Sequence, residues 1–332
     1  MIYLVWFTVI NLGNKMMDLN DKDIKSLFSK NKKCIVNADL DGVLSGMLLQ
    51  KFLNWEVVGY SSCCGKYNDE IWLRRNITNI DDCVFVDLPV CVPRIAVIDQ
   101  HFVGADKESL EKLNSMGNKI NPNNIRGRVY RNENGGCDYT KKYPFGTVHF
   151  ILAILEHFNF ISSDFVFDFT KKLGTFDLAD LVLRADRVIG NTFSYTPNCI
   201  DWSNWIIKLG GKQTLKLFNI VKNEYIQRKN NEKFVEDKLK SFGCSGLDGD
   251  CSDLFRSREY EKINIYFSYL GNALGIEKLP VFVVDDFGHL SGRKIEIYSN
   301  SINFIKDECR RDNVFSFAYI MMRTLSITYK ED

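Results

Sequence analysis

Short apolar runs that lead into acidic residues are the feature of this sequence that most constrains its fold. Residues 34–36, 83–86 and 95–98 are each apolar, and an aspartate follows each run within a few positions. Apolar residues also recur at helical spacing over 43–52 and over 105–116. Short strands that alternate with helices predict an α/β fold, a mostly parallel sheet covered by helices. Ligands bind beyond the carboxyl ends of such strands, so the aspartates mark the expected site.

A second, smaller domain is expected to follow the α/β domain. Residues 1–30 are assigned to an N-terminal extension, 31–195 to the α/β domain and 196–332 to an α+β domain with a candidate substrate-binding role. Further strands are predicted over 55–60, 281–284 and 294–298, and further helices over 69–76, 145–158, 164–173, 215–240 and 314–323. Residues 190–204 are predicted to connect the two domains.

The apolar run over residues 2–10 has two interpretations. It is far shorter than the roughly 20 residues that cross a bilayer, and no Lys or Arg precedes it as in a signal peptide. It is either an extra edge strand or an upstream extension before a natural start at Met16 or Met17. No later stretch has the length and apolarity of a membrane span, so no membrane partner is expected.

Charge and cysteine content exclude several classes of protein. Lys and Arg total 43 against 42 Asp and Glu, so contact with nucleic acid requires a local basic patch. The ten cysteines contain no C-x-x-C pair, which argues against a zinc ribbon or a thioredoxin-like redox site. Cys34 and Cys83 lie in apolar runs, so the simplest interpretation is reduced thiols in a cytoplasmic protein.

The acidic residues that follow the strands suit divalent metal ions. Asp39 and Asp41 come directly before Gly42, where the backbone can turn so that both carboxylates reach the same place. Asp87 arrives from the next apolar strand, and several carboxylates in one place repel one another unless cations neutralise them. Oxygen ligands with one imidazole favour Mn²⁺ or Mg²⁺, as one or two ions. The plainer interpretation is an Asp-Gly turn that caps the following helix.

Three motifs in order resemble the DHH phosphoesterase superfamily. Residues 37–45 read Asn-Ala-Asp-Leu-Asp-Gly-x-x-Ser, a lone strand-end aspartate follows at position 87, and residues 97–101 read Val-Ile-Asp-Gln-His. The family pattern is H-x-D-x-D-G-x-x-S, then a strand-end Asp, then D-H-H. Lys-Ile-Asn-Pro over 119–122 and Pro-Phe-Gly-Thr over 144–147 also resemble family segments. The similarity covers roughly residues 32–190 and implies the family fold and activity.

The resemblance assigns metal ligands residue by residue. It implies that Asp39 binds one metal ion, Asp41 the other, and that Asp87 bridges them. Asn37 and Gln100 stand where typical members have histidine ligands. Their carbonyl oxygens bind transition ions more weakly than imidazole, which favours Mg²⁺, a single ion or an inactive site.

The resemblance also assigns catalytic residues. His101 matches the histidine that faces the phosphate, and Asp99 matches the aspartate that orders the site; the plainer interpretation of His101 is a residue at a helix start. A further downstream aspartate is expected among the metal ligands. Asp177 is the candidate, with Asp180 and Asp186 as rivals.

Three residues are candidates for binding the substrate. The segment Phe-Gly-His-Leu-Ser-Gly-Arg over 287–293 is faintly similar to a glycine-rich substrate loop of the family, which makes His289 and Arg293 candidate substrate-binding residues. Arg184 is a third candidate, because an arginine can clamp a phosphate. Other basic residues that could do the same are Arg126, Arg187 and Lys294.

Three functions remain open at this point. The first is a metal-dependent phosphoesterase that hydrolyses phosphodiester bonds in single-stranded nucleic acid, short oligonucleotides or cyclic dinucleotides. The second is a catalytically inactive DHH-like binding or scaffold protein, which Asn37 and Gln100 favour. The third is a phosphatase of small phosphorylated molecules. The expected partner is a nucleic-acid or nucleotide substrate, together with a homo-oligomer or a protein complex.

Overall fold

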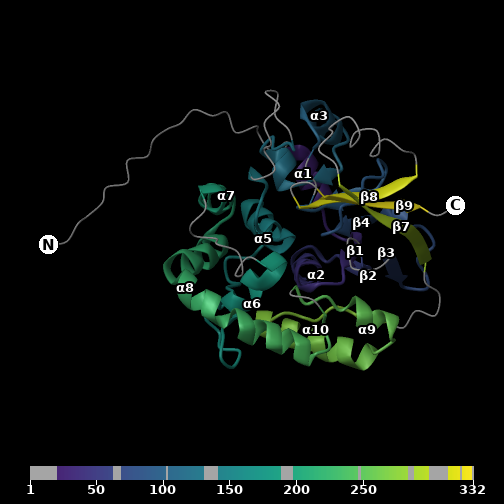
Figure 1. The fold of residues 1–332 in the computed structure, drawn as a ribbon. Helices are drawn as coiled ribbons and strands as arrows, with labels where there is room; N and C mark the ends of the chain where they lie inside the picture. Colours follow the sequence, from purple (N-terminus) through teal and green to yellow (C-terminus); the bar gives the residue numbers. More distant parts are fainter. Residues whose placement is uncertain are drawn as a thin grey trace, which may run out of the picture.

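The fold is α/β and is built on one long sheet (Figure 1). The computed structural model describes residues 21–62, 69–101, 104–130, 141–187, 197–245, 248–282, 288–298, 313–321 and 324–330. Within these residues the sheet has nine strands in the order β6-β5-β4-β1-β2-β3-β7-β9-β8. Its first six strands in this order are mostly parallel, as the alternating sequence pattern predicted.

Five parallel strands form the part of the sheet that carries the acidic residues. In sheet order they are β6 (Lys119–Ile120), β5 (Ala96–Ile98), β4 (Cys83–Val86), β1 (Lys33–Asn37) and β2 (Glu56–Ser61). Apart from the exposed first residues of β1 and β2, these strands are almost wholly buried, which is why their sequences read as continuous apolar runs.

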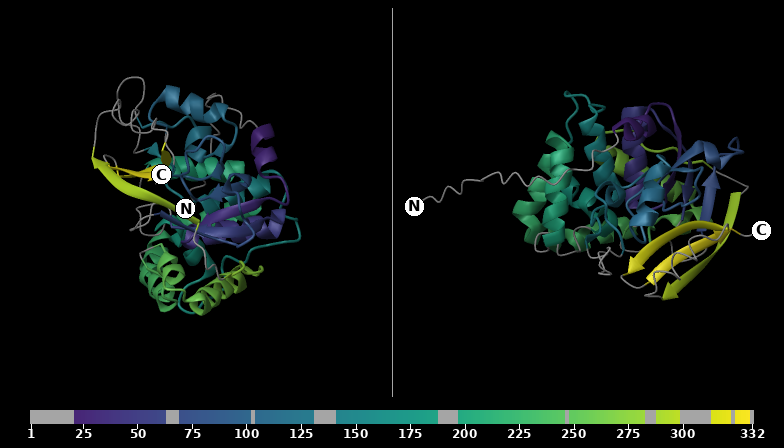
Figure 2. Two further views of the ribbon diagram at one scale, coloured as in Figure 1. Left: turned by 90° about the vertical axis from the view of Figure 1, so that its right-hand side faces the viewer. Right: turned by 90° about the horizontal axis from the view of Figure 1, so that it is seen from above.

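Antiparallel strands extend the sheet on its other side. β3 (Asp69–Leu73) pairs with β2, and β7 (Gly288–Tyr298) pairs with β3. β9 (Thr324–Lys330) lies between β7 and β8 (Val314–Met321). The late strands therefore belong to the same sheet as the early ones, and they lie away from helices α7 and α8 in Figure 1 and in the right-hand view of Figure 2. The proposed domain boundary near 195 stays a prediction.

Two segments that were predicted to be helices are strands. Residues 69–76 contribute β3, because Trp72 packs on one face of the sheet and Ile71 on the other. Residues 314–323 contribute β8, whose Phe315 ring lies 6.0 Å from that of Phe85. A short apolar run fits both periodicities, and here β-branched and aromatic residues with a strand partner decide the outcome.

Ten α-helices are described. They are α1 (Asp21–Leu27), α2 (Leu40–Leu53), α3 (Lys107–Ser115), α4 (Pro122–Ile125), α5 (Thr147–His157), α6 (Leu178–Arg184), α7 (Pro197–Leu209), α8 (Lys212–Ser241), α9 (Ser252–Arg256) and α10 (Tyr260–Leu274), with short 3₁₀ turns at Ile80–Asp82 and Ala185–Arg187. α2, α3, α5 and α8 confirm predicted helices. α7 begins inside the segment over 190–204, so the later part of that segment is helical, and its role as a connection between domains stays a prediction.

The predicted helix over 164–173 is absent, and the segment is irregular instead. Its phenylalanines alternate with other residues, so Phe165, Phe167 and Phe169 pack in a row with ring centroids 5.0 and 5.7 Å apart. Gln213 accepts the Phe167 N–H at 3.1 Å and donates to the Phe165 carbonyl at 2.8 Å. A period of two places the rings on one side, which a helix cannot do.

The two faces of the sheet are covered differently. α2, α5, α6, α8 and α10 bury one face in the larger core. The other face packs against the β8–β9 pair and against the segment after β4, where the Cys91 N–H donates to the Phe315 carbonyl at 2.8 Å. The α/β sheet with packed helices that the sequence predicted is thus confirmed, with the larger described core on the side of α2 and α5.

Two predictions concern parts that are described incompletely. Residues 1–20, which carry the apolar run over 2–10, lie outside the described residues. Of the predicted strand over 281–284, residues 281–282 are irregular and 283–284 lie outside the described residues. The predicted strand over 294–298 is confirmed as the end of β7. In the described part of the chain, no helix combines the length and apolar character needed to cross a membrane.

Candidate metal centre

Three adjacent strands bring their polar ends to one edge of the sheet. In the register, Val36 of β1 lies opposite Val86 of β4, which lies opposite Ile98 of β5. The residue that follows each position is Asn37, Asp87 or Asp99, so these three stand in a row at the carboxyl ends of β1, β4 and β5. This is the edge where the sequence predicted a ligand site.

Asp87, Asp99 and His101 offer ligand atoms that lie within 4.8 Å of one another. Asp99 holds His101 twice: its Oδ1 lies 2.6 Å from the ring Nδ1, and its Oδ2 accepts the His101 N–H at 2.7 Å. The same Nδ1 lies 3.8 Å from Oδ1 of Asp87. Both aspartates are buried, whereas the His101 side chain keeps 23% of its exposure. The group thus faces solvent on the side where the histidine lies.

Asp39 and Asp41 are both tied to helix starts. Asp39 Oδ1 caps α2 by accepting the Gly42 N–H at 2.9 Å, so the capping interpretation of the Asp-Gly turn is correct for one of its oxygens. Asp41 accepts the N–H groups of Thr147 and Val148, each at 2.7 Å, at the start of α5. The positive end of α5 therefore points at the acidic cluster.

Thr147 connects two of the carboxylates. Its N–H donates to Asp41, and its Oγ1 donates to Asp87 Oδ1 at 2.7 Å. The preceding residue must be glycine, because a Cβ at Gly146 would stand 2.6 Å from Oδ2 of Asp41. Sequence reasoning noted the Pro-Phe-Gly-Thr segment but gave it no role at the site.

The two amides that replace the expected histidines lie among the carboxylates. Asn37 Nδ2 donates to Asp39 Oδ2 at 2.8 Å and to Asp87 Oδ2 at 3.3 Å. Gln100 Nε2 donates to Asp186 Oδ2 at 3.1 Å. Gln100 is buried, and its Oε1 has no hydrogen-bond partner within the described residues. A buried amide oxygen without a hydrogen-bond donor fits an oxygen ligand to a cation.

Asp186, rather than Asp177, is the downstream aspartate that reaches this group. It stands in the left-handed region with φ 52° directly after α6, which turns the chain back towards Gln100. Asp177 instead caps α6 and pairs with Arg228 at 2.6 Å, and Asp180 lies 3.0 Å from the same guanidinium. Of the three predicted alternatives, the structure brings Asp186 to the site.

Burial and mutual repulsion shape the charge of the cluster. Burial, followed by the neighbouring carboxylates, raises the pKa of Asp87 and of Asp39 well above the usual range. Burial, then Asp186, raises the pKa of Asp41 to about 7. Burial opposes charging of His101, but Asp99 outweighs it and the pKa of His101 rises to about 9. The cluster thus retains protons that a divalent cation can replace, so these residues fit a hard metal ion.

A segment far along the chain completes the surroundings of Asp39. The Leu40 N–H donates to the Asp248 carbonyl at 3.0 Å, and the Cys251 N–H donates to the Ala38 carbonyl at 2.7 Å. The carboxylates of Asp248 and Asp250 add to the raised pKa of Asp39. No sequence motif singled out this segment, although residues 248–250 read Asp-Gly-Asp.

The predicted substrate-binding residues have different surroundings. Arg184 of α6 is fully buried and pairs with Glu236 of α8 at 2.7 Å. This ion pair joins the two helices. His289 and Arg293 lie in strand β7, and their side chains are outside the described residues.

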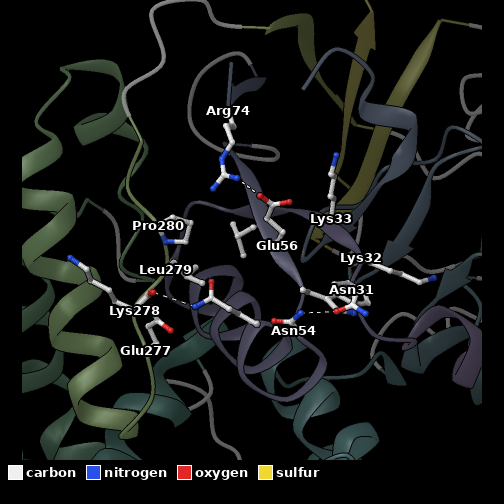
Figure 3. A pocket seen from close by; sticks show the side chains of 13 residues that line it. Asn31, Lys32, Lys33, Asn54, Glu56, Arg74, Glu277, Lys278, Leu279 and Pro280 are labelled. Atoms are coloured by element: carbon white, nitrogen blue, oxygen red, sulfur yellow. Dashed lines mark hydrogen bonds and ion pairs between the residues drawn. The ribbon is translucent and has the colours of Figure 1, made fainter. Parts of the chain in front are cut away.

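A hollow of about 590 Å³ lies at the opposite end of the parallel strands (Figure 3). It is lined by Lys33 and Glu56, which begin β1 and β2, and by Arg74, which pairs with Glu56. Lys278 offers its carbonyl to Gln50 at 3.3 Å on the other side. Because it opens at the amino ends of the strands, this hollow is separate from the candidate metal centre.

Comparison with known proteins adds no relative: no protein-family model, no curated protein and no solved structure matches the chain. The similarity to the DHH superfamily therefore remains a resemblance of motifs.

Proposed function

We propose that this chain is a divalent-metal-dependent phosphoesterase that hydrolyses phosphodiester bonds in single-stranded nucleic acid, short oligonucleotides or cyclic dinucleotides. The observation that carries the proposal is that Asp87, a candidate metal ligand, stands beside the hydrogen-bonded pair of Asp99 and His101, with one polar atom of each of the three within 4.8 Å of the others. Asp41 and Asp186 lie around this group and repel each other. A divalent cation can replace the protons that these buried carboxylates retain, and the motif order agrees with a phosphoesterase.

In this proposal each residue has a role. Asp87 holds Mg²⁺ or Mn²⁺ together with Asp39, Asp41 and Asp186, and Asn37 and Gln100 contribute amide oxygens after rotation of their side chains. A bound divalent ion lowers the pKa of a coordinated water and neutralises charge on the phosphoryl oxygens.

The dyad of Asp99 and His101 acts on the substrate side. Asp99 orients the ring through Nδ1 at 2.6 Å, and its negative charge favours the protonated imidazole. A protonated imidazole can then donate to a phosphate oxygen or to the leaving oxygen.

A second function is favoured by one specific observation. The Asn37 amide already donates to Asp39 and Asp87, and the Gln100 amide donates to Asp186. These hydrogen bonds relieve part of the repulsion without any metal ion. An inactive binding or scaffold protein would keep this arrangement.

Hydrolysis assays with paired variants separate the two functions. The purified chain is incubated with Mg²⁺ or Mn²⁺ and a labelled single-stranded oligonucleotide, a cyclic dinucleotide or a phosphomonoester. We expect product from the first two substrates, and a loss of at least a hundredfold in Asp87→Asn. Asp164→Asn, an exposed aspartate away from the edge, serves as the matched control. Equal background rates for the wild type and Asp87→Asn would reject the enzyme.

Restoring the histidines tests the scaffold function. The double variant Asn37→His with Gln100→His is compared with the wild type in the same assay. Metal-dependent hydrolysis that appears only in the double variant identifies the natural chain as an inactive member. Hydrolysis by the wild type rejects the scaffold function.

A further inference from the structure

The side-chain amide of Asn37 closes the gap between two of the candidate metal ligands. Its Nδ2 donates to Oδ2 of Asp39 at 2.8 Å and to Oδ2 of Asp87 at 3.3 Å. Its Oδ1 accepts the Ala38 N–H at 3.0 Å. The opposite orientation would turn the amide oxygen towards two carboxylates and the amino group towards an N–H donor. These three hydrogen bonds therefore fix which way the amide points.

The remaining oxygens of the two carboxylates also accept hydrogen bonds from the protein. Oδ1 of Asp39 accepts the Gly42 N–H at 2.9 Å. Oδ1 of Asp87 accepts the Thr147 hydroxyl at 2.7 Å. A Mg²⁺ ion between the carboxylates would need an oxygen of each at about 2.0–2.1 Å. The Asn37 nitrogen already lies within hydrogen-bond distance of both, so the amide and an ion compete for one position.

The amide of Gln100 has a different arrangement. Its Nε2 donates to Oδ2 of Asp186 at 3.1 Å, but its buried Oε1 has no hydrogen-bond partner among the residues that the structure describes. Asp186 is also the carboxylate that repels Asp41 most strongly. Gln100 can therefore offer an oxygen to a cation beside two carboxylates that repel each other. Asn37 offers no such oxygen until its amide turns.

We propose that the metal centre has two unequal cation positions. The first ion binds next to Asp186, on the side of the Gln100 oxygen. The second position, between Asp39 and Asp87, is closed by Asn37 and opens only when the amide turns away and loses its three hydrogen bonds. Two of these bonds go to carboxylates, which makes them the stronger kind. The inference rests on the proposed phosphoesterase function and concerns the number of ions at its site.

The closed position still attracts a cation. The Asn37 amide carries no net charge, so it satisfies the hydrogen bonding of Asp39 and Asp87 without neutralising them. Their negative charge favours an ion over the amide once the concentration of the ion is high enough to offset the lost hydrogen bonds. The second ion is therefore expected to bind after the first and at a higher Mg²⁺ concentration.

Counting the bound ions tests the inference without reference to hydrolysis. The full chain is freed of metal with EDTA, moved to buffer without EDTA and titrated with Mg²⁺ by isothermal titration calorimetry. In the wild type we expect one ion per chain and a second that binds at least about tenfold more weakly or is not detected. In Asn37→Ala, the second ion should bind at least about tenfold more tightly than in the wild type, because no amide closes its position.

Three further variants keep the result interpretable. Asn37→Ser carries a side chain too short to reach both carboxylates, so it should match Asn37→Ala and replaces it if that protein folds poorly. Gln100→Met keeps the length of the side chain without its oxygen and should weaken the first ion about tenfold. Asn264→Ala removes an exposed amide of α10 that accepts a hydrogen bond from Lys278, and it should bind both ions as the wild type does.

Several outcomes overturn the inference. These are two ions of equal affinity in the wild type, or a second ion whose affinity is the same in the wild type and in both Asn37 variants. An unchanged first ion in Gln100→Met would likewise contradict the place of that ion. None of these results affects the proposed phosphoesterase, which can use two equal ions. Two unequal ions without hydrolysis reject only the enzyme, and the absence of any bound ion in all of these proteins rejects both proposals.

Discussion

The Thr147 hydroxyl donates a 2.7 Å hydrogen bond to Asp87, a residue 60 positions earlier in the chain. Both side chains are buried, so the bond fixes the orientation of one metal-ligand candidate. We expect Thr147→Val to weaken Mg²⁺ or Mn²⁺ binding about tenfold, as measured by isothermal titration calorimetry. Thr147→Ser keeps the hydroxyl and should bind metal as the wild type does. Equal affinities in the valine and serine variants would contradict this role.

Gly146→Ala tests the close approach between α5 and Asp41. The added methyl group would stand 2.6 Å from Oδ2 of Asp41, so the start of α5 or the carboxylate has to move. We expect a loss of about 1–3 kcal/mol in the free energy of unfolding, measured with urea, and weaker metal binding. Wild-type stability together with wild-type metal affinity would contradict the close packing of Gly146 against Asp41.

Asp177 and Asp186 should differ in what their removal affects. Asp177→Asn leaves Arg228 without its 2.6 Å partner, so it should cost about 1–3 kcal/mol of stability and leave metal affinity unchanged. Asp186→Asn should reduce metal affinity at least tenfold with little loss of stability, because it removes one charge from a crowded acidic group. Titration calorimetry and urea unfolding of both proteins distinguish the roles; a reversed pattern would restore Asp177 as the downstream ligand.

The stability of the metal-free protein should fall as pH rises. The pKa of Asp41 lies at about 7 in the folded state against an ordinary 3.8, and that of His101 at about 9 against 6.5. In both cases the folded state binds a proton that the unfolded state has released. The contribution of Asp41 to the free energy of unfolding is therefore complete below about pH 4 and is lost as the pH rises to about 7. The contribution of His101 is complete below about pH 6.5 and is lost as the pH rises to about 9.

Divalent ions should reverse this loss. The melting temperature is measured at pH 5, 7 and 9 in EDTA and in saturating Mg²⁺. We expect the gain from Mg²⁺ to be several-fold larger at pH 9 than at pH 5, because protons compete with the metal at low pH. A gain that does not change with pH would mean that Mg²⁺ binds elsewhere.

His149 should give a pH dependence of opposite sign. Burial lowers its pKa to about 4, and its neutral Nδ1 accepts the Gly146 N–H at 3.0 Å. A depressed histidine pKa means that stability is lost as pH falls from 6.5 through 4, by at most about 1.4 kcal/mol per pH unit. In His149→Asn, the free energy of unfolding, measured with urea at each pH, should depend less on pH between 6.5 and 4. The same slope in both proteins would exclude His149 as its origin.

The positions of Asp87 and Asp99 at one edge of the sheet could be predicted from the sequence, because each follows a strand that its own residues define. Each strand that bears Asp87 or Asp99 is a short apolar run, and neighbouring parallel strands align their ends at one edge. The choice between Asp177 and Asp186 could not be predicted, because it depends on a left-handed turn after α6 that no sequence period reports. β8 was missed because its apolar run fits a helix until its partner β9 is known.

The contribution of the Asp248 segment was also beyond sequence reasoning. It reaches Asp39 through backbone hydrogen bonds between positions more than 200 residues apart, and such pairings leave no local periodicity. By contrast, α5 and α8 were predicted closely, because each carries a long pattern that its own residues determine.

The contact between Cys251 and Ala38, across 213 positions, has a consequence for synthesis of the protein. The loop that carries Asp39 leaves the ribosome early, but the residues that fasten it follow only after α8. Until then the acidic turn lacks part of its framework, and closing so large a loop costs entropy that local contacts cannot repay. A nascent chain stopped before Cys251 has β1 to β6 but lacks the segment that fastens this turn, so we expect the candidate metal centre to be completed late in translation.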